Sequence, residues 1–453
     1  MDCSHAWNKT MVVAMHVPWK HHRRRLHHRG LRGFQCYALS KAGQRFFTLV
    51  ATKRKAGDTL ANSRLIKKFV TSSPKSVALE ALSHLLSHPH LSSLAFPLYL
   101  KITEAPWFVW NPTLVAQVAA CLDRQCQDKE SARLLSECIS KLQPKERELA
   151  LFYRDLIDSQ SRHGSARGFE ESCARLRQLV CDSSSVYVKR QGYRGMISGL
   201  CEVGKPGEAE ELMREMTRVG IKASMFEFRC VLHGYGRLGW LKEMQRIIDE
   251  MLSEGVEVDS AFSNMILSSY GAHSALPEMV VWLRKMKSLG IPLSIRSYYS
   301  VLSSCPAILS LVQNNSKEDG LPISLGELMK VLGEDEAMLV EGLVGSSVLN
   351  EVMEWDALEG RLDLHGMDLG SAYLIMLQWM EELRSIFGNG SNVVPAEIRV
   401  VCGWGKHSRE RGKSPLKRMV KEIMVRTGSP MRIDRENLGC FVAKGKVVRD
   451  WLV

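Results

Sequence analysis

The sequence MISGLCEVGKPGEAEELMREMTRVGIKAS, residues 196–224, decides the fold because the chain repeats its pattern twice more. The copies lie at 231–259 and 266–294, so the period is 35 residues. Four columns keep their character in all three copies: Leu200, Tyr235 and Tyr270; Met216, Met251 and Met286; Gly220, Gly255 and Gly290; and Ile221, Val256 and Ile291. A fixed period in this range predicts a solenoid, in which each unit buries its apolar face against its neighbours.

Each copy predicts two helices joined by a turn. In the second copy, residues 226–235 are apolar at helical spacing, and residues 241–252 carry a second apolar stripe. Gly236 and Gly239 separate the two stretches, and Gly255 follows the second in the position that commonly ends a helix. The other two copies share this pattern, so we expect an α-solenoid of helical hairpin repeats.

The endings of the copies, EMTRVGIKAS, EMLSEGVEVD and KMKSLGIPLS, closely resemble those of the pentatricopeptide repeat (PPR) family of RNA-binding proteins. A tetratricopeptide array, which mostly binds proteins, is the alternative, but its period is 34 residues. The resemblance implies single-stranded RNA as the partner and an array of about four units over residues 151–310. Its clear units are expected at 191–225, 226–260 and 261–295, after a degenerate unit at 151–190.

In this family each repeat presents one base to two or three side chains. The resemblance places these side chains at the fourth position of a repeat and at the second-last position before the next. The pairs are Arg194 with Ser224, Arg229 with Asp259, and Asn264 with Ser294. The last pair resembles the family's Asn–Ser combination, which favours cytosine, whereas the two arginines depart from the code. An arginine there stacks on a base or meets a phosphate; the alternative is a solvated repeat face that binds no RNA.

The N-terminal segment accounts for nearly all of the net charge of +12. Residues 1–57 hold twelve Lys and Arg against one acid, a net of +11, which leaves +1 for the rest of the chain (12 − 11). This acid-poor segment, with KHHRRRLHHRGLRG at 20–33, resembles an organelle transit peptide and is expected to be disordered. Family habit favours the chloroplast over the mitochondrion. The alternative is a basic arm that stays attached and binds RNA.

Composition characterises two further stretches. Residues 58–150 have the apolar spacing of amphipathic helices. Residues 311–360 hold eleven acids and two bases, which predicts an acidic connector with short helices at 325–332 and 344–355, packed against one neighbour. Its charge would repel a phosphate backbone. No apolar run reaches the roughly 18 residues of a membrane span, so we expect no membrane partner.

Strand and helix patterns alternate over residues 361–453, which predicts a small α/β domain with a mixed sheet. Within it, LDLHG at 362–366 and CGWGKHS at 402–408 resemble two motifs of the Smr (small MutS-related) domain. The second motif departs from the family at Cys402, where Thr is usual. A PPR array followed by an Smr domain is a known plant organellar architecture, which this chain resembles.

The two motifs contain residues suited to phosphate binding and to acid–base chemistry. Gly403 and Gly405 free backbone N–H groups to approach phosphate, and Lys406 adds positive charge. Asp363 and His365 alternate along a strand and therefore share one face of it. These residues predict a phosphate-binding surface with a carboxylate and a histidine beside it.

The Smr family includes nicking endonucleases, so the resemblance makes Asp363, His365 and His407 the candidate catalytic residues. A carboxylate and histidines beside a phosphate either perform metal-free acid–base cleavage or hold a divalent metal ion. The alternative is that Asp363 and His365 rigidify their loop while the domain only binds. The sequence leaves open whether the domain is an enzyme.

Two functions are consistent with these features. The first is an organellar RNA-binding protein that acts in transcript processing, stability or translation, with an Smr domain that binds or cleaves RNA. The second is a non-catalytic interaction scaffold, in which the array packs against proteins and the C-terminal domain contacts DNA, nucleoids or an organellar ribonucleoprotein.

Overall fold

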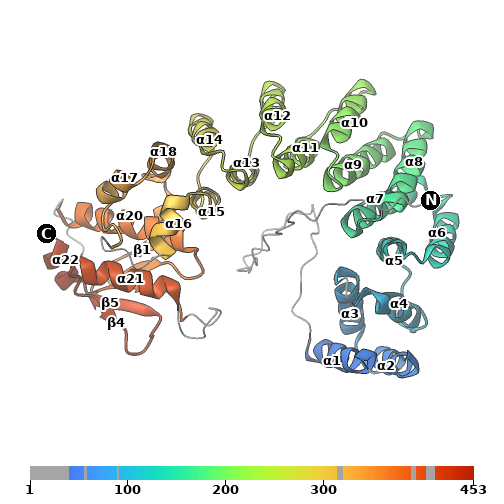
Figure 1. The fold of residues 1–453 in the computed structure, drawn as a ribbon, viewed down its shortest axis with the longest axis horizontal. Coiled ribbons are helices and arrows are strands. Elements are labelled where there is room, and N and C mark those ends of the chain that lie inside the picture. Colours follow the sequence, from blue (N-terminus) through green and yellow to red (C-terminus); the bar gives the residue numbers. More distant parts are fainter. Residues whose placement is uncertain are drawn as a thin grey trace, which may run out of the picture.

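The computed structural model describes residues 40–55, 59–88, 91–313, 320–388, 394–404 and 414–452. Within these ranges, helices form a curved array, and a small sheet domain closes its C-terminal end (Figure 1). None of the helices described combines the length and apolar character needed to cross a membrane.

The array consists of helices that pair as hairpins. They are α1 (Lys41–Lys55), α2 (Thr59–Ser72), α3 (Lys75–Ser87), α4 (Ala95–Thr103), α5 (Pro112–Arg124), α6 (Asp128–Leu142), α7 (Glu146–His163), α8 (Ala166–Asp182), α9 (Val186–Glu202), α10 (Pro206–Arg218), α11 (Met225–Leu238), α12 (Leu241–Ser253), α13 (Ser260–Ala272), α14 (Leu276–Ser288), α15 (Ile295–Leu302) and α16 (Pro306–Gln313). From α5 onward, the first helices of successive hairpins stack along the inner side of the curve, and α6, α8, α10, α12 and α14 lie outside them (Figure 1). We call these the inner and outer helices.

The periodic residues of the sequence form the turns that end the outer helices. After α10, Gly220 has a φ of 80°, and the N–H of Ile221 donates to the carbonyl of Met216 at 3.0 Å. The next two outer helices close with the same bond, from Val256 to Met251 at 3.2 Å and from Ile291 to Met286 at 2.9 Å. This bond is the signature of the Schellman motif, which requires a left-handed residue and favours glycine there.

The fourth periodic column ends the inner helices in a similar way. The carbonyls of Leu200, Tyr235 and Tyr270 accept hydrogen bonds from the N–H groups of Lys205, Trp240 and Ala275, at 2.8, 3.1 and 3.0 Å. The 35-residue period therefore records the two turns of each hairpin, whose backbone groups would otherwise lack partners.

A tyrosine on α11 and one on α13 each connect their hairpin to the preceding one. The hydroxyl of Tyr235 donates to the buried carboxylate of Glu210 on α10 at 2.6 Å, and the hydroxyl of Tyr270 donates to the amide oxygen of Gln245 on α12 at 2.7 Å. Arg246 also donates to Glu210 at 2.7 Å. The two contacts have the same geometry and differ in the charge of the acceptor.

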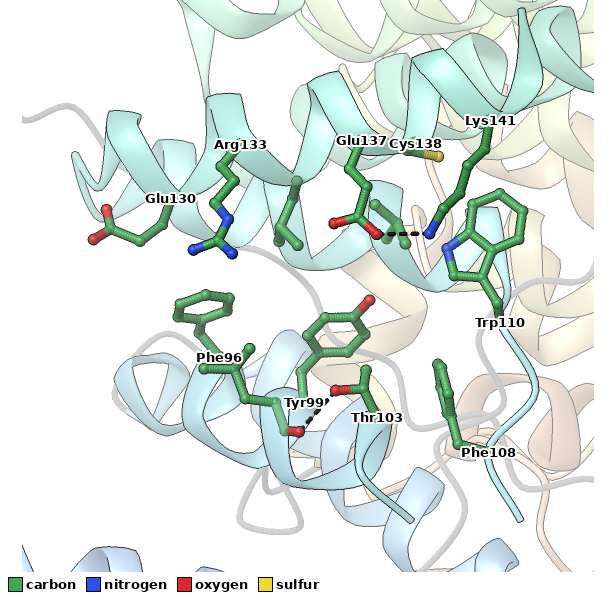
Figure 2. Close-up of a pocket in the computed structure, with 13 residues that line it drawn as sticks. Phe96, Tyr99, Thr103, Phe108, Trp110, Glu130, Arg133, Glu137, Cys138 and Lys141 are labelled. Carbon is green, nitrogen blue, oxygen red and sulfur yellow. Dashed lines mark hydrogen bonds and ion pairs between the residues drawn. The ribbon is translucent and has the colours of Figure 1, made fainter. Parts of the chain in front are cut away.

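The outer helices leave a cavity near the N-terminal end of the array. Figure 2 shows this space of about 460 Å³ between α4 and α6. Its lining includes Phe96, Tyr99, Trp110, Arg133, Glu137 and Lys141. Glu137 and Lys141 form an ion pair at 2.6 Å, and the Lys141 ammonium lies 5.4 Å from the Trp110 ring centroid. The inner helix α5 also reaches the cavity, through Val115.

The C-terminal domain contains a five-stranded mixed sheet, as the sequence predicts. Its elements are α17 (Leu325–Val331), α18 (Glu334–Leu343), α19 (Val348–Val352), β1 (Met353–Trp355), β2 (Glu359–Asp363), α20 (Leu369–Gly388), β3 (Glu397–Val401), α21 (Pro415–Arg426), β4 (Arg432–Ile433), β5 (Cys440–Lys444) and α22 (Gly445–Leu452). The strand order is β1-β2-β3-β5-β4, and β2 and β3 are parallel while the other pairs are antiparallel. The helix α20 makes the crossover that a parallel pair needs.

The sheet domain packs directly onto the last hairpin of the array through α20, which contacts α15 and α16. At this junction the hydroxyl of Tyr298, a fully buried residue of α15, donates to the carbonyl of Leu343 at 2.8 Å. The same hydroxyl lies 3.1 Å from Ser346 and 3.1 Å from Gln378 of α20. Array and sheet domain therefore share one buried polar junction.

Three predicted boundaries are wrong. Residues 41–55, part of the segment predicted to be disordered, form α1, whose Phe46 stacks on Phe69 of α2 at 4.1 Å; the rest of that prediction lies outside the described residues. The helical region predicted at 58–150 contains a hairpin, α5–α6, that stacks on α7 as part of the array. The sheet domain begins before the predicted start at 361, because β1 pairs with β2. The preceding helices α17, α18 and α19 pack against α20 and α14, in a stretch predicted to be a packed connector with short helices.

We expect Tyr235→Phe to destabilise α11 more than Tyr270→Phe destabilises α13. The first change removes a hydrogen bond to a charged acceptor, worth about 1.5–3 kcal/mol, and the second a bond to a neutral one, worth about 0.5–1.5 kcal/mol. Native-state hydrogen exchange measures the local opening free energy of each helix. Equal losses of opening free energy in the two variants would contradict the view that the charged acceptor Glu210 makes the stronger hydrogen bond.

Candidate nucleic-acid interface

The structure brings each predicted base-reading pair together. Arg194 lies on α9, Arg229 on α11 and Asn264 on α13, all inner helices. Their partners Ser224, Asp259 and Ser294 are the N-cap residues of α11, α13 and α15. A pair therefore joins one inner helix to the N-terminus of the next: Arg194 lies in the middle of α9, whereas Arg229 and Asn264 lie near the starts of α11 and α13. The 30-residue separation within a pair follows from the stacking.

Arg194 is held by a buried carboxylate. Its Nε donates to Glu227 at 2.9 Å, and the Glu227 side chain is fully buried. The same carboxylate accepts from the backbone N–H of Ser224 at 2.7 Å and from its hydroxyl at 2.6 Å, forming a capping box for α11. The guanidinium also lies 4.6 Å from the ring centroid of Phe226. Arg194 is thus a structural counter-ion, because releasing it would leave a buried charge uncompensated.

Arg229 is held more weakly than Arg194. Its Nη2 lies 3.5 Å from both carboxylate oxygens of Asp259, whose side chain is 61% exposed. Exposed ion pairs of this kind contribute about 0–1 kcal/mol. Because little free energy holds it in place, Arg229 can exchange its partner for a phosphate or a base.

Asn264 is 8% exposed and is satisfied within the protein. Its amide nitrogen donates to Ser294 at 3.3 Å, and its amide oxygen accepts from the hydroxyl of Ser297 at 2.7 Å. The predicted cytosine-reading pair is therefore preassembled, with its polar edge engaged by α15.

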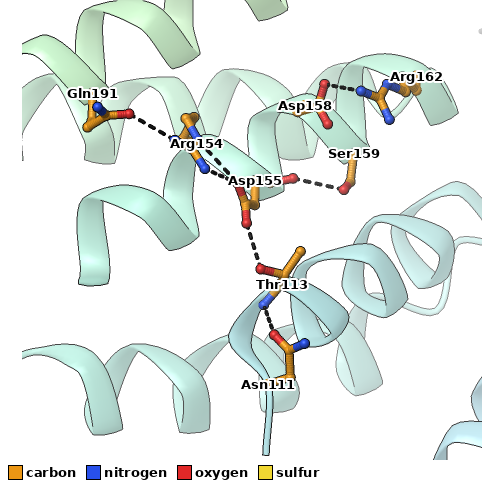
Figure 3. Close-up of polar contacts among 8 residues, drawn as sticks. All are labelled: Asn111, Thr113, Arg154, Asp155, Asp158, Ser159, Arg162 and Gln191. Atoms are coloured by element: carbon orange, nitrogen blue, oxygen red, sulfur yellow. Dashed lines mark hydrogen bonds and ion pairs between the residues drawn. The ribbon is translucent and has the colours of Figure 1, made fainter. Parts of the chain in front are cut away.

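Polar contacts between neighbouring inner helices continue toward the N-terminus, as Figure 3 shows. We call this series of contacts, together with the three pairs above, the polar line. Thr113 of α5 donates to Asp155 of α7 at 2.7 Å, and Asp155 forms an ion pair with Arg154 at 2.9 Å. Arg154 donates in turn to Gln191 of α9 at 2.8 Å. The polar line thus connects inner helices well before the three clear repeats.

In the C-terminal domain, Asp363 and His365 form a dyad. The Nδ1 atom of His365 lies 2.5 Å from one carboxylate oxygen of Asp363, and the His365 N–H donates to the same oxygen at 3.1 Å. The other oxygen accepts from Arg361 at 3.0 Å. The contact with Asp363 at Nδ1 directs Nε2 of His365 away from the carboxylate, and this side chain is 51% exposed.

In the neighbouring motif, the Cys402 side chain is buried and the Gly403 N–H already has a hydrogen-bond partner. Burial raises the pKa of the Cys402 thiol to about 12, so this thiol is protonated at neutral pH and is no nucleophile. Gly403 has a φ of 76°, and its N–H donates to the carbonyl of Gly439 at 3.1 Å. The prediction that Gly403 offers this N–H to phosphate is therefore wrong, because Gly439, in the turn before β5, provides an acceptor for it.

The described residues do not fit a metal ion. Among them, no group of three or more His, Cys, Asp or Glu side chains converges. Asp363, the carboxylate of the predicted site, has one oxygen in contact with Arg361 and the other in contact with His365. The predicted site residues Gly405, Lys406 and His407 lie outside the described ranges.

Comparison with known proteins agrees with the repeat geometry. A family model described as the PPR repeat matches residues 193–221 and 228–256. The pentatricopeptide repeat-containing protein At2g17033 of Arabidopsis thaliana is 54% identical over 418 residues, which cover 91% of this chain and 82% of that protein. The chain belongs to the pentatricopeptide repeat family.

Other similar proteins match less of their own length. The Arabidopsis thaliana pentatricopeptide repeat-containing protein At1g74750 is 30% identical over 95 residues, covering 20% of this PPR protein and 11% of that one. Among solved structures, maize PPR10 is 16% identical with a TM-score of 0.37, and the match covers 88% of this chain and 58% of that chain. PPR10 in complex with an 18-nt psaJ RNA element matches with a TM-score of 0.27 at 14% identity, covering 67% of this chain and 46% of that chain.

The sequence prediction missed three residues that position those at the candidate sites in this PPR protein. They are Glu227, Ser297 and Arg361, which contact Arg194, Asn264 and Asp363. Glu227 carried a readable signal, since Ser224 and Glu227 have the spacing of a capping box. Arg361 also carried a local signal, since it lies two residues before Asp363 on β2 and so shares its face. Ser297 carried none, because Asn264 lies on a different inner helix.

We expect Arg194→Ala to destabilise the array and Arg229→Ala to leave its stability nearly unchanged. The first change strands the buried Glu227 carboxylate and costs about 3 kcal/mol, whereas the second removes an exposed pair and costs less than about 1 kcal/mol. Hydrogen exchange of α9 and α11 measures the loss. A smaller loss for Arg194→Ala than for Arg229→Ala would contradict the assigned roles.

Proposed function

We propose that this protein binds single-stranded RNA along its inner helices. The observation that supports this most directly is the line of 30-residue pairs joining α9 to α11, α11 to α13 and α13 to α15. The PPR family supplies the choice of ligand, since PPR10 of that family has been crystallised with an 18-nt RNA element. Bases would lie between successive inner helices, where Arg229 and Asp259 offer polar groups open to solvent and the ring of Phe226 is partly exposed.

The pairs contribute unequally to this function. Asn264 with Ser294 provides the one base-reading pair that resembles the family's code, favouring cytosine. Arg229 provides a cation that can meet a phosphate, because its ion pair with Asp259 is long and exposed. Arg194 shapes the site by holding the start of α11. So short a reading segment supports RNA binding of low sequence specificity.

We further propose that the sheet domain is an Smr-type domain that binds and cleaves RNA. The motif resemblances at 362–366 and 402–408 and the Asp363–His365 dyad support this assignment. Asp363 orients the ring of His365 so that Nε2 can accept a proton. In cleavage, Nε2 would take the ribose 2′-hydroxyl proton, the 2′-oxygen would attack phosphorus, and the leaving 5′-oxygen would take a proton from water.

The cellular setting that we propose is an organelle, with the chloroplast favoured over the mitochondrion. The basic, acid-poor N-terminal segment supports import. Because α1 packs on α2 and α3, a cleaved leader would end before Lys41. The role there would be transcript processing, stability or translation.

Binding to single-stranded RNA should weaken steeply with salt, and Arg229→Ala should flatten that dependence. Loss of one phosphate contact lowers the slope of log K against log salt by about 0.7 for single strands. Fluorescence anisotropy across a salt series measures it. Arg218→Ala on the outer helix α10 is the control and should leave the slope unchanged. No measurable RNA binding by the wild-type protein would favour the protein-binding scaffold.

RNA cleavage should continue in the presence of EDTA and fall at least about 100-fold in Asp363→Ala and in His365→Ala, since general acid–base groups contribute about 10²–10⁴-fold. Gel analysis of a labelled single strand measures the rate. Asp450→Ala, an exposed acid on α22, is the control. Wild-type RNA binding with no cleavage, or cleavage that both variants retain, would show that the dyad only rigidifies its loop.

A further inference from the structure

An exposed tryptophan lies next to the Asp363–His365 dyad. Trp404 follows β3 and is 59% exposed, which is unusual for the largest side chain in a water-soluble fold. Its indole N–H donates to the side-chain oxygen of Asn437 at 2.8 Å. That oxygen also accepts from the backbone N–H of Gly439 at 3.1 Å. The ring is thus held in one orientation while most of its surface stays open to solvent.

The backbone beneath the ring is shaped to receive it. A Cβ atom on Gly439 would lie 2.8 Å from Cδ1 of Trp404 and 3.0 Å from the carbonyl carbon of Gly403. Any side chain larger than hydrogen at position 439 would therefore displace the indole. One edge of the ring, with Nε1 and Cδ1, packs against this turn, and the rest of the ring projects outward.

The position of the ring relative to the dyad is fixed by the strand ends. A Cβ atom on Gly403 would lie 3.6 Å from Cβ of His365. The N–H groups of Cys402 and Gly403 both donate to the carbonyl of Gly439, at 2.8 and 3.1 Å. Trp404 directly follows Gly403, which lies against His365. A base stacked on Trp404 would therefore place its ribose and phosphate near His365.

The surroundings favour a nucleotide over an apolar protein surface. The described residues 414–452 hold nine basic and four acidic side chains. Arg432 and Arg435 are exposed on the β4–β5 hairpin that carries Asn437. Of the acids in that hairpin, Asp434 pairs with Arg399 at 3.2 Å. An open aromatic ring within a positive surface matches what single-stranded nucleic acid requires, namely a stacking platform and cations for its backbone.

We propose that Trp404, held by Asn437 above Gly439, is a base-stacking site that seats one unpaired nucleotide of an RNA strand next to the Asp363–His365 dyad. This inference rests on the proposed RNA-binding function and adds to it a nucleotide subsite in the sheet domain. Stacking on a ring accepts every base, so the subsite places the strand without reading its sequence. It takes unpaired nucleotides only, because a base within a duplex has no free face.

The test compares full-length wild type with Trp404→Ala, Trp404→Phe and Trp240→Ala. Trp240 is the control because it is 49% exposed but lies in the turn before the outer helix α12. The probe is a mixed-sequence single-stranded RNA of 18 nucleotides, the length bound by PPR10. We expect Trp404→Ala to weaken binding about fivefold to a hundredfold, Trp404→Phe to weaken it less, and Trp240→Ala to leave it unchanged.

Duplex RNA of the same sequence separates stacking from a general loss of structure. We expect Trp404→Ala to leave duplex binding unchanged, because a base within a duplex has no free face to stack on the ring. A misfolded sheet domain would instead weaken the binding of both RNAs. Wild-type affinity of Trp404→Ala for the single strand, or an equal loss for single strand and duplex, would overturn the subsite while leaving the proposed function intact. Failure of the wild-type protein to bind any RNA would instead overturn the proposed function.

Discussion

The backbone hydrogen bond that closes each helix is the interaction on which the rest of the structure depends. At the end of α10, α12 and α14, a glycine at positive φ lets the next N–H reach back to a buried methionine carbonyl. The bond satisfies backbone groups that the helix leaves free and turns the chain by a fixed amount. Because the turn recurs every 35 residues, successive inner helices meet in the same register. The polar pairs along the inner side are a consequence of that register.

Structure and recognition use the same side chains along this inner line. A residue on one inner helix contacts the N-terminal turn of the next, so it caps and stacks at the same time. Where the partner is buried, as Glu227 is for Arg194, the contact is committed to stability. Where the partner is exposed, as Asp259 is for Arg229, the contact costs little to break and is open to exchange with a ligand. Burial of the partner therefore separates the two arginines, although they occupy the same column of the repeat.

The junction at Tyr298 gives the sheet domain a fixed place at the end of the array. Its hydroxyl contacts Leu343, Ser346 and Gln378, which come from the segment after α18 and from α20. A strand of RNA leaving the last inner helix would therefore meet the sheet domain at one defined position. Of the acids that the structure describes in residues 311–360, Glu336 alone is buried, and its carboxylate accepts from the N–H of Ala307 at 3.0 Å.

Sequence periodicity was sufficient for the solenoid, the clear repeats and the pairing of Arg194, Arg229 and Asn264 with their partners, because local turns repeat at a fixed interval. Alternating strand and helix patterns were likewise sufficient for the mixed sheet. The expectation that Asp363 and His365 share one strand was wrong, because β2 ends at Asp363 and His365 lies in the turn after it. Boundaries at 57, 150 and 360 failed because α1, the α5–α6 hairpin and β1 belong to the same packed units as the next elements along the chain, α2, α7 and β2. That packing has no signature in the spacing of apolar residues alone.

The sequence by itself determined which residues stand at each repeated position. Only the tertiary structure decided what those residues can do. Arg194 and Arg229 occupy the same position of the repeat in the sequence. They differ because Arg194 contacts the buried carboxylate of Glu227 and Arg229 contacts the exposed carboxylate of Asp259. The N–H of Gly403 was predicted to bind phosphate, but it donates to the carbonyl of Gly439 in the turn before β5. Partners that arrive from other elements set burial and hydrogen bonding, and these quantities have no local signature in a sequence.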